Sequence, residues 1–305
     1  MNGFVNVRAS ADLSAVSSML LGGPEIMKPE SFTFGICFSI IAGVAANPIY
    51  RSDPLALVLT EIRHPQSPPP ERSTLGELKT ALQQWTPIED REVMKQINIE
   101  TGEQTTSVST KLVSRDRRVA TTFRPDAMTV EVTDYQGWEK FRALVDALVD
   151  ARQDVAPVDG CFRIGLRYIN EIRLPTGDKP NWAEYVASSL LGPHEDLAKF
   201  GFHSVAEQHA LQCAGSSPGD ALTLRYGVAN GAVIQSTPAL RRRTEPSNPA
   251  APFFLIDLDG SWSDSEGAVP ELTRELVVQT LERVHQPIRD IFESLITDDL
   301  RKVFG

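Results

Sequence analysis

The chain has 305 residues, of which 30 are basic and 40 acidic, so its formal net charge at pH 7 is −10. Hydrophobic residues make up 41% and charged residues 23%, a composition typical of folded globular proteins and not of disordered chains. The acidic balance argues against a nucleic-acid partner, because binding along a phosphate backbone needs a basic surface.

The three cysteines are Cys37, Cys161 and Cys213. Their odd number and wide spacing exclude a disulfide framework and a zinc site of the Cys-x-x-Cys type. Free thiols are typical of a reducing compartment, so we expect a cytoplasmic protein.

The first 49 residues differ in composition from the rest and contain only five charged side chains. Residues 32–46 form an uncharged run of 15 residues, shorter than the roughly 20 that a membrane-spanning helix needs. We therefore expect no membrane partner. We interpret residues 1–49 as an N-terminal extension or as the result of a mis-assigned start; a signal peptide beginning at Met27 is the alternative.

A short sequence pattern occurs twice, at residues 59–65 (LTEIRHP) and 169–175 (INEIRLP). Hydrophobic spacing after the first copy predicts a short helix at 75–85 and a final helix at 138–149. The strands predicted between these helices are 95–101, 104–113, 119–123 and 128–132.

A similar order of elements follows the second copy. The pattern predicts a short helix at 182–190 and a long helix over about 270–299, in which Pro287 indicates a kink or break. Residues 229–252 contain glycine and proline without periodicity and are expected to form a mobile loop. The predicted strands are 203–213, 221–228 and 253–258.

Because both halves show the same order, the sequence predicts an α+β fold made of two tandem units related by internal duplication. Each unit, 50–155 and 156–305, would consist of a strand, a helix, an antiparallel meander and a final helix. We expect the two units to pack as one globular body. It would have a saddle-like or grip-like sheet with long helices on one face.

The repeated segments supply candidate binding residues. Glu61 and Arg63 share one face of a strand, as do Glu171 and Arg173. If the two strands pair, we expect Glu61 to face Arg173 and Arg63 to face Glu171. A charged patch that holds a ligand or a partner is the alternative interpretation.

Arginines also gather before the second copy. Arg163 and Arg167 share a strand face with Arg173, and three guanidinium groups in a row require nearby carboxylates or a bound anion. The basic run 241–243 lies in the predicted loop, where it would be solvated or contact an anionic partner.

Signals for catalysis are few. The chain contains no Gly-rich phosphate loop, and we assign no catalytic residue and no cofactor. Asp257 and Asp259 share a strand face and are weak candidates for a divalent cation. The alternative is that they face solvent or arginine partners.

Three segments resemble a sporadically distributed family of uncharacterised bacterial proteins: 163–172 (RIGLRYINEI), 135–141 (YQGWEKF) and 292–301 (FESLITDDLR). The resemblance covers about 48–303 and implies no activity, cofactor or site residue. The patchy distribution of the family implies a link to bacterial defence or toxin control.

The function that these observations favour is a non-enzymatic binding protein with a protein partner. A small-molecule or anion sensor is the first alternative, with its site at the arginine-rich strand or between sheet and helix. A metal-dependent enzyme using Asp257 and Asp259 is the second alternative.

Overall fold

The structure, a computed structural model, describes residues 50, 53–97, 104–174, 180–202, 207–264, 267 and 269–305. Its contacts divide the chain into two compact units, 1–48 with 93–107 and 49–92 with 108–305. The site and cavities discussed below belong to the second unit. The predicted N-terminal extension, its signal-peptide alternative, Cys37 and parts of two predicted strands (98–101, 203–206) lie outside the described residues.

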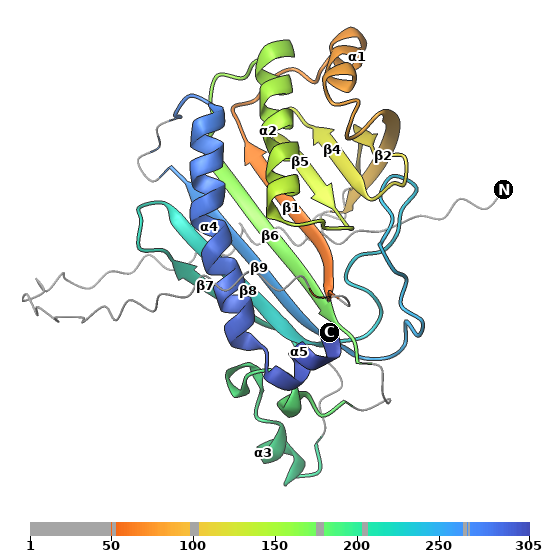
Figure 1. Ribbon diagram of the computed structural model, residues 1–305, viewed down its shortest axis with the longest axis vertical. Coiled ribbons are helices and arrows are strands. Elements are labelled where there is room, and N and C mark those ends of the chain that lie inside the picture. Colours follow the sequence, from red (N-terminus) through yellow and green to blue (C-terminus); the bar gives the residue numbers. More distant parts are fainter. Residues whose placement is uncertain are drawn as a thin grey trace, which may run out of the picture. The chain divides into compact units, whose positions relative to one another are not determined.

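Nine strands form one antiparallel sheet in the order β2-β3-β4-β5-β1-β6-β9-β8-β7 (Figure 1). Strands β1 and β6, which carry the two copies of the repeated pattern, are neighbours near its middle. The strands are Leu55–Arg63 (β1), Ile88–Ile97 (β2), Gln104–Val113 (β3), Val119–Phe123 (β4), Ala127–Val132 (β5), Arg163–Ile172 (β6), His209–Ala214 (β7), Asp220–Ala229 (β8) and Phe253–Ser263 (β9).

Two long helices pack on the sheet (Figure 1). Helix α2 (Trp138–Val155) contacts β5, and α4 (Arg274–Leu295) contacts β6 and β9. The hydrophobic spacing that predicts both helices is confirmed by a stripe of buried residues along each. Thr273 caps α4 by accepting a hydrogen bond from the Leu276 amide. The other helical elements are α1 (Arg72–Ala81), α3 (His194–Ala198), α5 (Asp298–Phe304), and the 3-10 turns η2 (Trp182–Glu184) and η3 (Ser188–Leu190).

The main hydrophobic core lies between these two helices and the sheet. Ile62 and Ile164 face each other across β1 and β6, and both are completely buried in it. Successive strand residues alternate between faces, so the charged neighbours of Ile62 and Ile164 project to the opposite face of the sheet. The core therefore decides which face carries the charged side chains.

The expected fold is wrong in its architecture. The structure has one continuous nine-stranded antiparallel sheet with few helices, in place of two tandem units that share a saddle-like or grip-like sheet with long helices on one face. Internal duplication is not shown: 50–155 supplies five strands, whereas 156–305 supplies four. The local patterns predict single elements, but the pairing of distant strands decides how the sheet is built.

The region 230–252 has no helix or strand, as expected, yet it packs on the sheet face opposite the main core. Ile234, Ala239 and Leu240 are buried there in a second hydrophobic cluster with Leu57 and Ile169. Burial of these side chains anchors the segment, which the glycine and proline content alone did not indicate.

One smaller prediction also differs, because the helix expected at 182–190 is replaced by η2 and η3. Of the kink or break expected at Pro287, the break is excluded, since α4 continues through that residue. A proline interrupts one backbone hydrogen bond, but burial on the sheet keeps the helix continuous. No helix in the described part of the chain is long and apolar enough to cross a membrane.

Candidate functional site

Charged side chains cover the middle of the sheet on the face opposite α2 and α4. We call this surface the charged face. It combines residues of four strands and of the turn after β4: Glu61, Arg63, Arg124, Arg163, Arg167, Arg225, Asp257 and Asp259. Four of the six predicted binding residues belong to it, together with both weak metal candidates.

Opposite charges alternate across the strands of this face. Glu61 Oε2 accepts a hydrogen bond from Arg124 Nη2 at 2.6 Å, and Glu61 Oε1 accepts one from Arg63 Nε at 2.7 Å. Arg163 lies between Glu61 at 3.4 Å and Asp259 at 3.6 Å. Arg225 continues the row at 3.9 Å from Asp259. The result is a row of alternating charges built on strands.

The absence of a side chain at Gly165 makes room for the central arginine. Gly165 pairs with Glu61 on one side and Ser261 on the other. A Cβ atom at Gly165 would come within 2.7 Å of Nη1 of Arg163, so the guanidinium group lies directly over this glycine. The sequence Arg-Ile-Gly therefore places the arginine head between two neighbouring carboxylates.

A second group of ion pairs surrounds Asp257, whose side chain is only 2% exposed. Both of its oxygens accept hydrogen bonds from Arg167, at 2.7 and 2.6 Å, and Arg225 lies 3.5 Å away. This bidentate pairing confirms the arginine-partner interpretation for Asp257. Within the described ranges, no cluster of three or more histidine, cysteine or acidic residues is arranged to hold a metal.

The carboxylates of the charged face titrate differently. Burial raises the pKa of Glu61, but hydrogen bonds from Arg63 and Arg124 outweigh it, so the pKa lies below its usual value. Asp259 shows the opposite balance, because burial raises its pKa more than Arg163, Arg167 and Arg225 lower it. Asp259 is thus the carboxylate of this row with the weaker preference for its charged form.

The predicted pairing between the repeated segments is wrong. In the register of β1 and β6, Glu61 lies opposite Gly165 and Arg63 lies opposite Arg163. Neither pair, Glu61 with Arg173 or Arg63 with Glu171, is formed. The antiparallel register places the two copies so that their charged ends lie at opposite ends of the paired strands.

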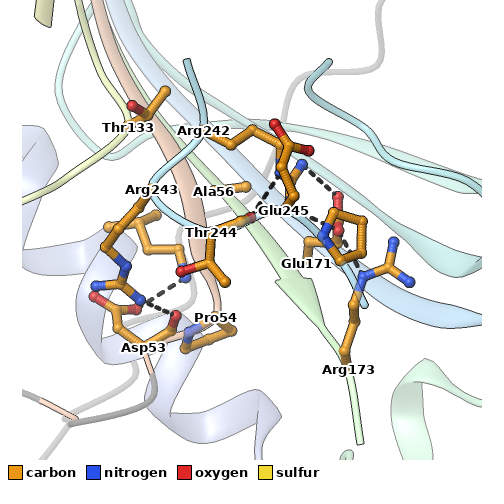
Figure 2. A pocket seen from close by; sticks show the side chains of 12 residues that line it. Asp53, Pro54, Ala56, Thr133, Glu171, Arg173, Arg242, Arg243, Thr244 and Glu245 are labelled. Atoms are coloured by element: carbon orange, nitrogen blue, oxygen red, sulfur yellow. Dashed lines mark hydrogen bonds and ion pairs between the residues drawn. The ribbon is translucent and has the colours of Figure 1, made fainter. Parts of the chain in front are cut away.

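Glu171 and Arg173 form a separate cluster at the far end of β6 (Figure 2). Buried Glu171 accepts hydrogen bonds from Arg173 Nε at 2.8 Å, from Arg242 at 2.8 and 3.0 Å, and from the Val233 amide at 3.0 Å. Arg242 is only 8% exposed. Part of the basic run 241–243 therefore neutralises a buried carboxylate, contrary to the expectation of a solvated loop.

A small cavity of about 150 Å³ adjoins this cluster. Figure 2 shows Arg242 and Arg173 converging on Glu171, while Arg243 turns toward Asp53. Arg243 Nη2 donates to the backbone oxygen of Asp53 at 2.7 Å. The arginines lining the cavity are therefore already engaged, Arg173 and Arg242 with Glu171 and Arg243 with a backbone oxygen.

The sequence interpretation missed Arg124, Arg225 and Arg242 as members of these clusters. Arg225 had a usable signal, since it lies on a strand that can pair with the segment of Asp257. Arg124 and Arg242 lie in a turn and in an irregular segment, where no periodicity predicts the direction of a side chain.

No family model, no curated protein and no solved structure matches the chain. The resemblance to a bacterial family therefore stays an interpretation of the three sequence segments.

Proposed function

We propose that this chain is a cytoplasmic, non-enzymatic binding protein that holds a protein partner on the charged face. The observation that carries the proposal concerns Arg163 and Arg225. Both meet their carboxylates only at 3.4 to 3.9 Å, and their side chains are 22% and 31% exposed. Each guanidinium group offers five N–H donors, so both retain donors for acceptors of a partner.

The arrangement supports a protein surface as partner. Arginine is enriched at protein interfaces, where it combines a planar donor group with an apolar stem. The charged face displays guanidinium groups from β6 and β8 and the turn after β4, with carboxylates between them. Such alternation favours a partner whose acidic groups face these arginines and whose basic groups face these carboxylates, because like charges in contact repel each other.

The charged face also fits a smaller anion, which is the second candidate function. Arg225 donates no side-chain hydrogen bond to any described residue, so a carboxylate or phosphate has a donor group available there.

The link to defence or toxin control rests on the family resemblance alone. The geometry disfavours a metal at Asp257, because Arg167 occupies both of its oxygens.

A comparison of two double variants tests the proposal. Arg163→Ala with Arg225→Ala removes the two loosely paired arginines of the charged face. Arg142→Ala with Arg283→Ala is the matched control, because these helix arginines are similarly exposed, at 35% and 39%, and also pair with carboxylates. Each chain is purified at native expression level from its source cells, and co-purifying proteins are quantified by mass spectrometry.

The proposal predicts a protein in fixed ratio with the original chain and the control, and its loss from the charged-face variant. All variants must first show the same cooperative melting. Equal retention by both variants, or no stoichiometric protein at all, would contradict the proposal. Replacement of the protein by a bound small anion in native mass spectra would favour the second candidate.

A further inference from the structure

A second cavity lies away from the charged face, between the sheet and the first half of α2. It measures about 310 Å³, at the lower end of the range of small-molecule sites in proteins. Its lining comes from the turn after α1, from β4 and β5, and from the first turns of α2. We call it the aromatic cavity.

The interior of the aromatic cavity is apolar. Val132, Phe141 and Leu144 are buried members of the main core, and they line one part of it. Trp85 and Tyr135 line it as well, but remain partly exposed. Two aromatic rings left partly exposed beside an apolar wall offer stacking and edge contacts to a planar ligand.

Most charged groups at the mouth of the cavity already have partners. Arg118 Nη1 donates to Asp134 at 3.0 Å. Asp116 accepts from the Ser114 hydroxyl at 2.6 Å and from the Arg118 amide at 3.2 Å. Arg118 is therefore neutralised by Asp134, and Asp116 is held by hydrogen bonds from neutral donors.

Lys140 is the exception at this mouth. It lies in the first turn of α2 and is exposed, and no carboxylate among the described residues forms an ion pair with it. An ammonium group beside aromatic walls favours a ligand that carries a negative charge at one end.

From this geometry we propose that the aromatic cavity binds a small planar aromatic acid. The ring of the ligand contacts Trp85 and Tyr135, and its carboxylate pairs with Lys140 at the mouth. The site shares no residue with the charged face, so it adds a binding activity that does not depend on the proposed protein partner.

The test is a titration of the full chain with phenylacetate, salicylate and indoleacetate, each compared with its neutral amide. Binding is followed through the indole N–H resonance of Trp85, which an aromatic ligand shifts by its ring current. Trp85→Phe identifies that resonance among those of the four tryptophans. We expect at least one acid to shift the Trp85 resonance in a saturable way and to raise the melting temperature.

Two variants separate the roles of charge and shape. Lys140→Gln should weaken binding of the acid about tenfold and bring its affinity near that of the amide, whereas Lys302→Gln, at a paired lysine, should not. Val119→Phe fills the cavity from β4 and should abolish binding without lowering the melting temperature.

The proposal is overturned if no acid of the panel shifts the Trp85 resonance. It is also overturned if Val119→Phe binds as the original chain does, or if acid and amide bind equally well. The variant with Arg163→Ala and Arg225→Ala should bind the acids normally. Failure of the charged-face experiment would therefore leave this result unaffected.

Discussion

At the scale of single residues, the two glutamates of the repeated pattern have different surroundings. Glu61 lies on the charged face with its side chain 18% exposed, whereas the Glu171 side chain is 1% exposed and held by two arginines. Removing one partner of a buried ion pair leaves an uncompensated charge in the interior. The same three-residue motif therefore contributes a surface group in one copy and a structural group in the other.

This difference predicts which second substitution restores stability. Glu171→Arg should lower the free energy of unfolding by about 3–5 kcal/mol, because it places a third cation beside Arg173 and Arg242. Adding Arg242→Glu should recover part of the loss, since it restores opposite charges. Adding Arg63→Glu should recover none. Urea unfolding of the three variants measures this, and rescue by Arg63→Glu would contradict the assigned pairing.

His285 makes the stability depend on pH. Its ring stacks on Trp138 with centroids 3.9 Å apart, and burial, aided by Arg289, lowers its pKa from 6.5 to about 4. The unfolded chain binds this proton below pH 6.5, whereas the folded chain binds it only near pH 4. The contribution of neutral His285 is therefore complete above pH 6.5 and is lost as the pH falls toward 4.

We expect urea midpoints to fall across this pH window in the original chain and less steeply in His285→Phe, which keeps an aromatic ring against Trp138. Equal slopes for His285→Phe and the original chain would show that other groups cause the pH dependence.

At the scale of elements, turns connect the strands at positions that only glycine suits. Gly219, between β7 and β8, has a φ of +82°, and a Cβ atom there would fall on the carbonyl oxygen of Ser263. Gly231 has a similar φ of +90° but open space around its Cα. The two glycines thus separate the cost of backbone conformation from the cost of a steric clash.

Gly219→Ala should therefore destabilise the protein more than Gly231→Ala, by about 1–3 kcal/mol. Both variants introduce a side chain at positive φ, but only the first also collides with the backbone of β9. Thermal unfolding of both variants measures the difference. Equal losses would mean that the β7–β8 turn can shift to accept the side chain.

At the scale of the whole molecule, the pairing of β1 with β6 joins both halves of the chain. Val58 and Ile62 of β1 and Leu166 of β6 are completely buried in one core. Separating the halves would expose these side chains together with two unpaired central strand edges, which promote aggregation. The sheet is therefore expected to form only when both halves are present.

Cutting the chain between residues 155 and 156 tests this expectation. Fragments 50–155 and 156–305 should each be insoluble or unfolded when expressed alone, and should form a soluble complex when expressed together. Solubility, circular dichroism and size-exclusion chromatography report the outcome. A fragment that folds cooperatively as a monomer would contradict the dependence on the β1–β6 pair.

Much of the local structure follows from the sequence alone. The apolar stripes of α2 and α4 and the strand character of the two repeated segments were predictable, because side-chain periodicity reflects the geometry of a single element. Asp257 and Asp259 share one strand face, as do Arg163 and Arg167, and this too follows from the geometry of a single strand. These features depend on residues that are close together in the sequence.

How these elements meet depends on long-range packing. The register of β1 against β6 placed Glu61 beside Arg163, and the packing of 230–252 brought Arg242 to Glu171. Both outcomes depend on burying apolar side chains from distant parts of the chain, a balance that no local pattern contains. For that reason the sequence determined the strand faces and helix stripes, whereas the single sheet and the partners of each charge came from long-range packing.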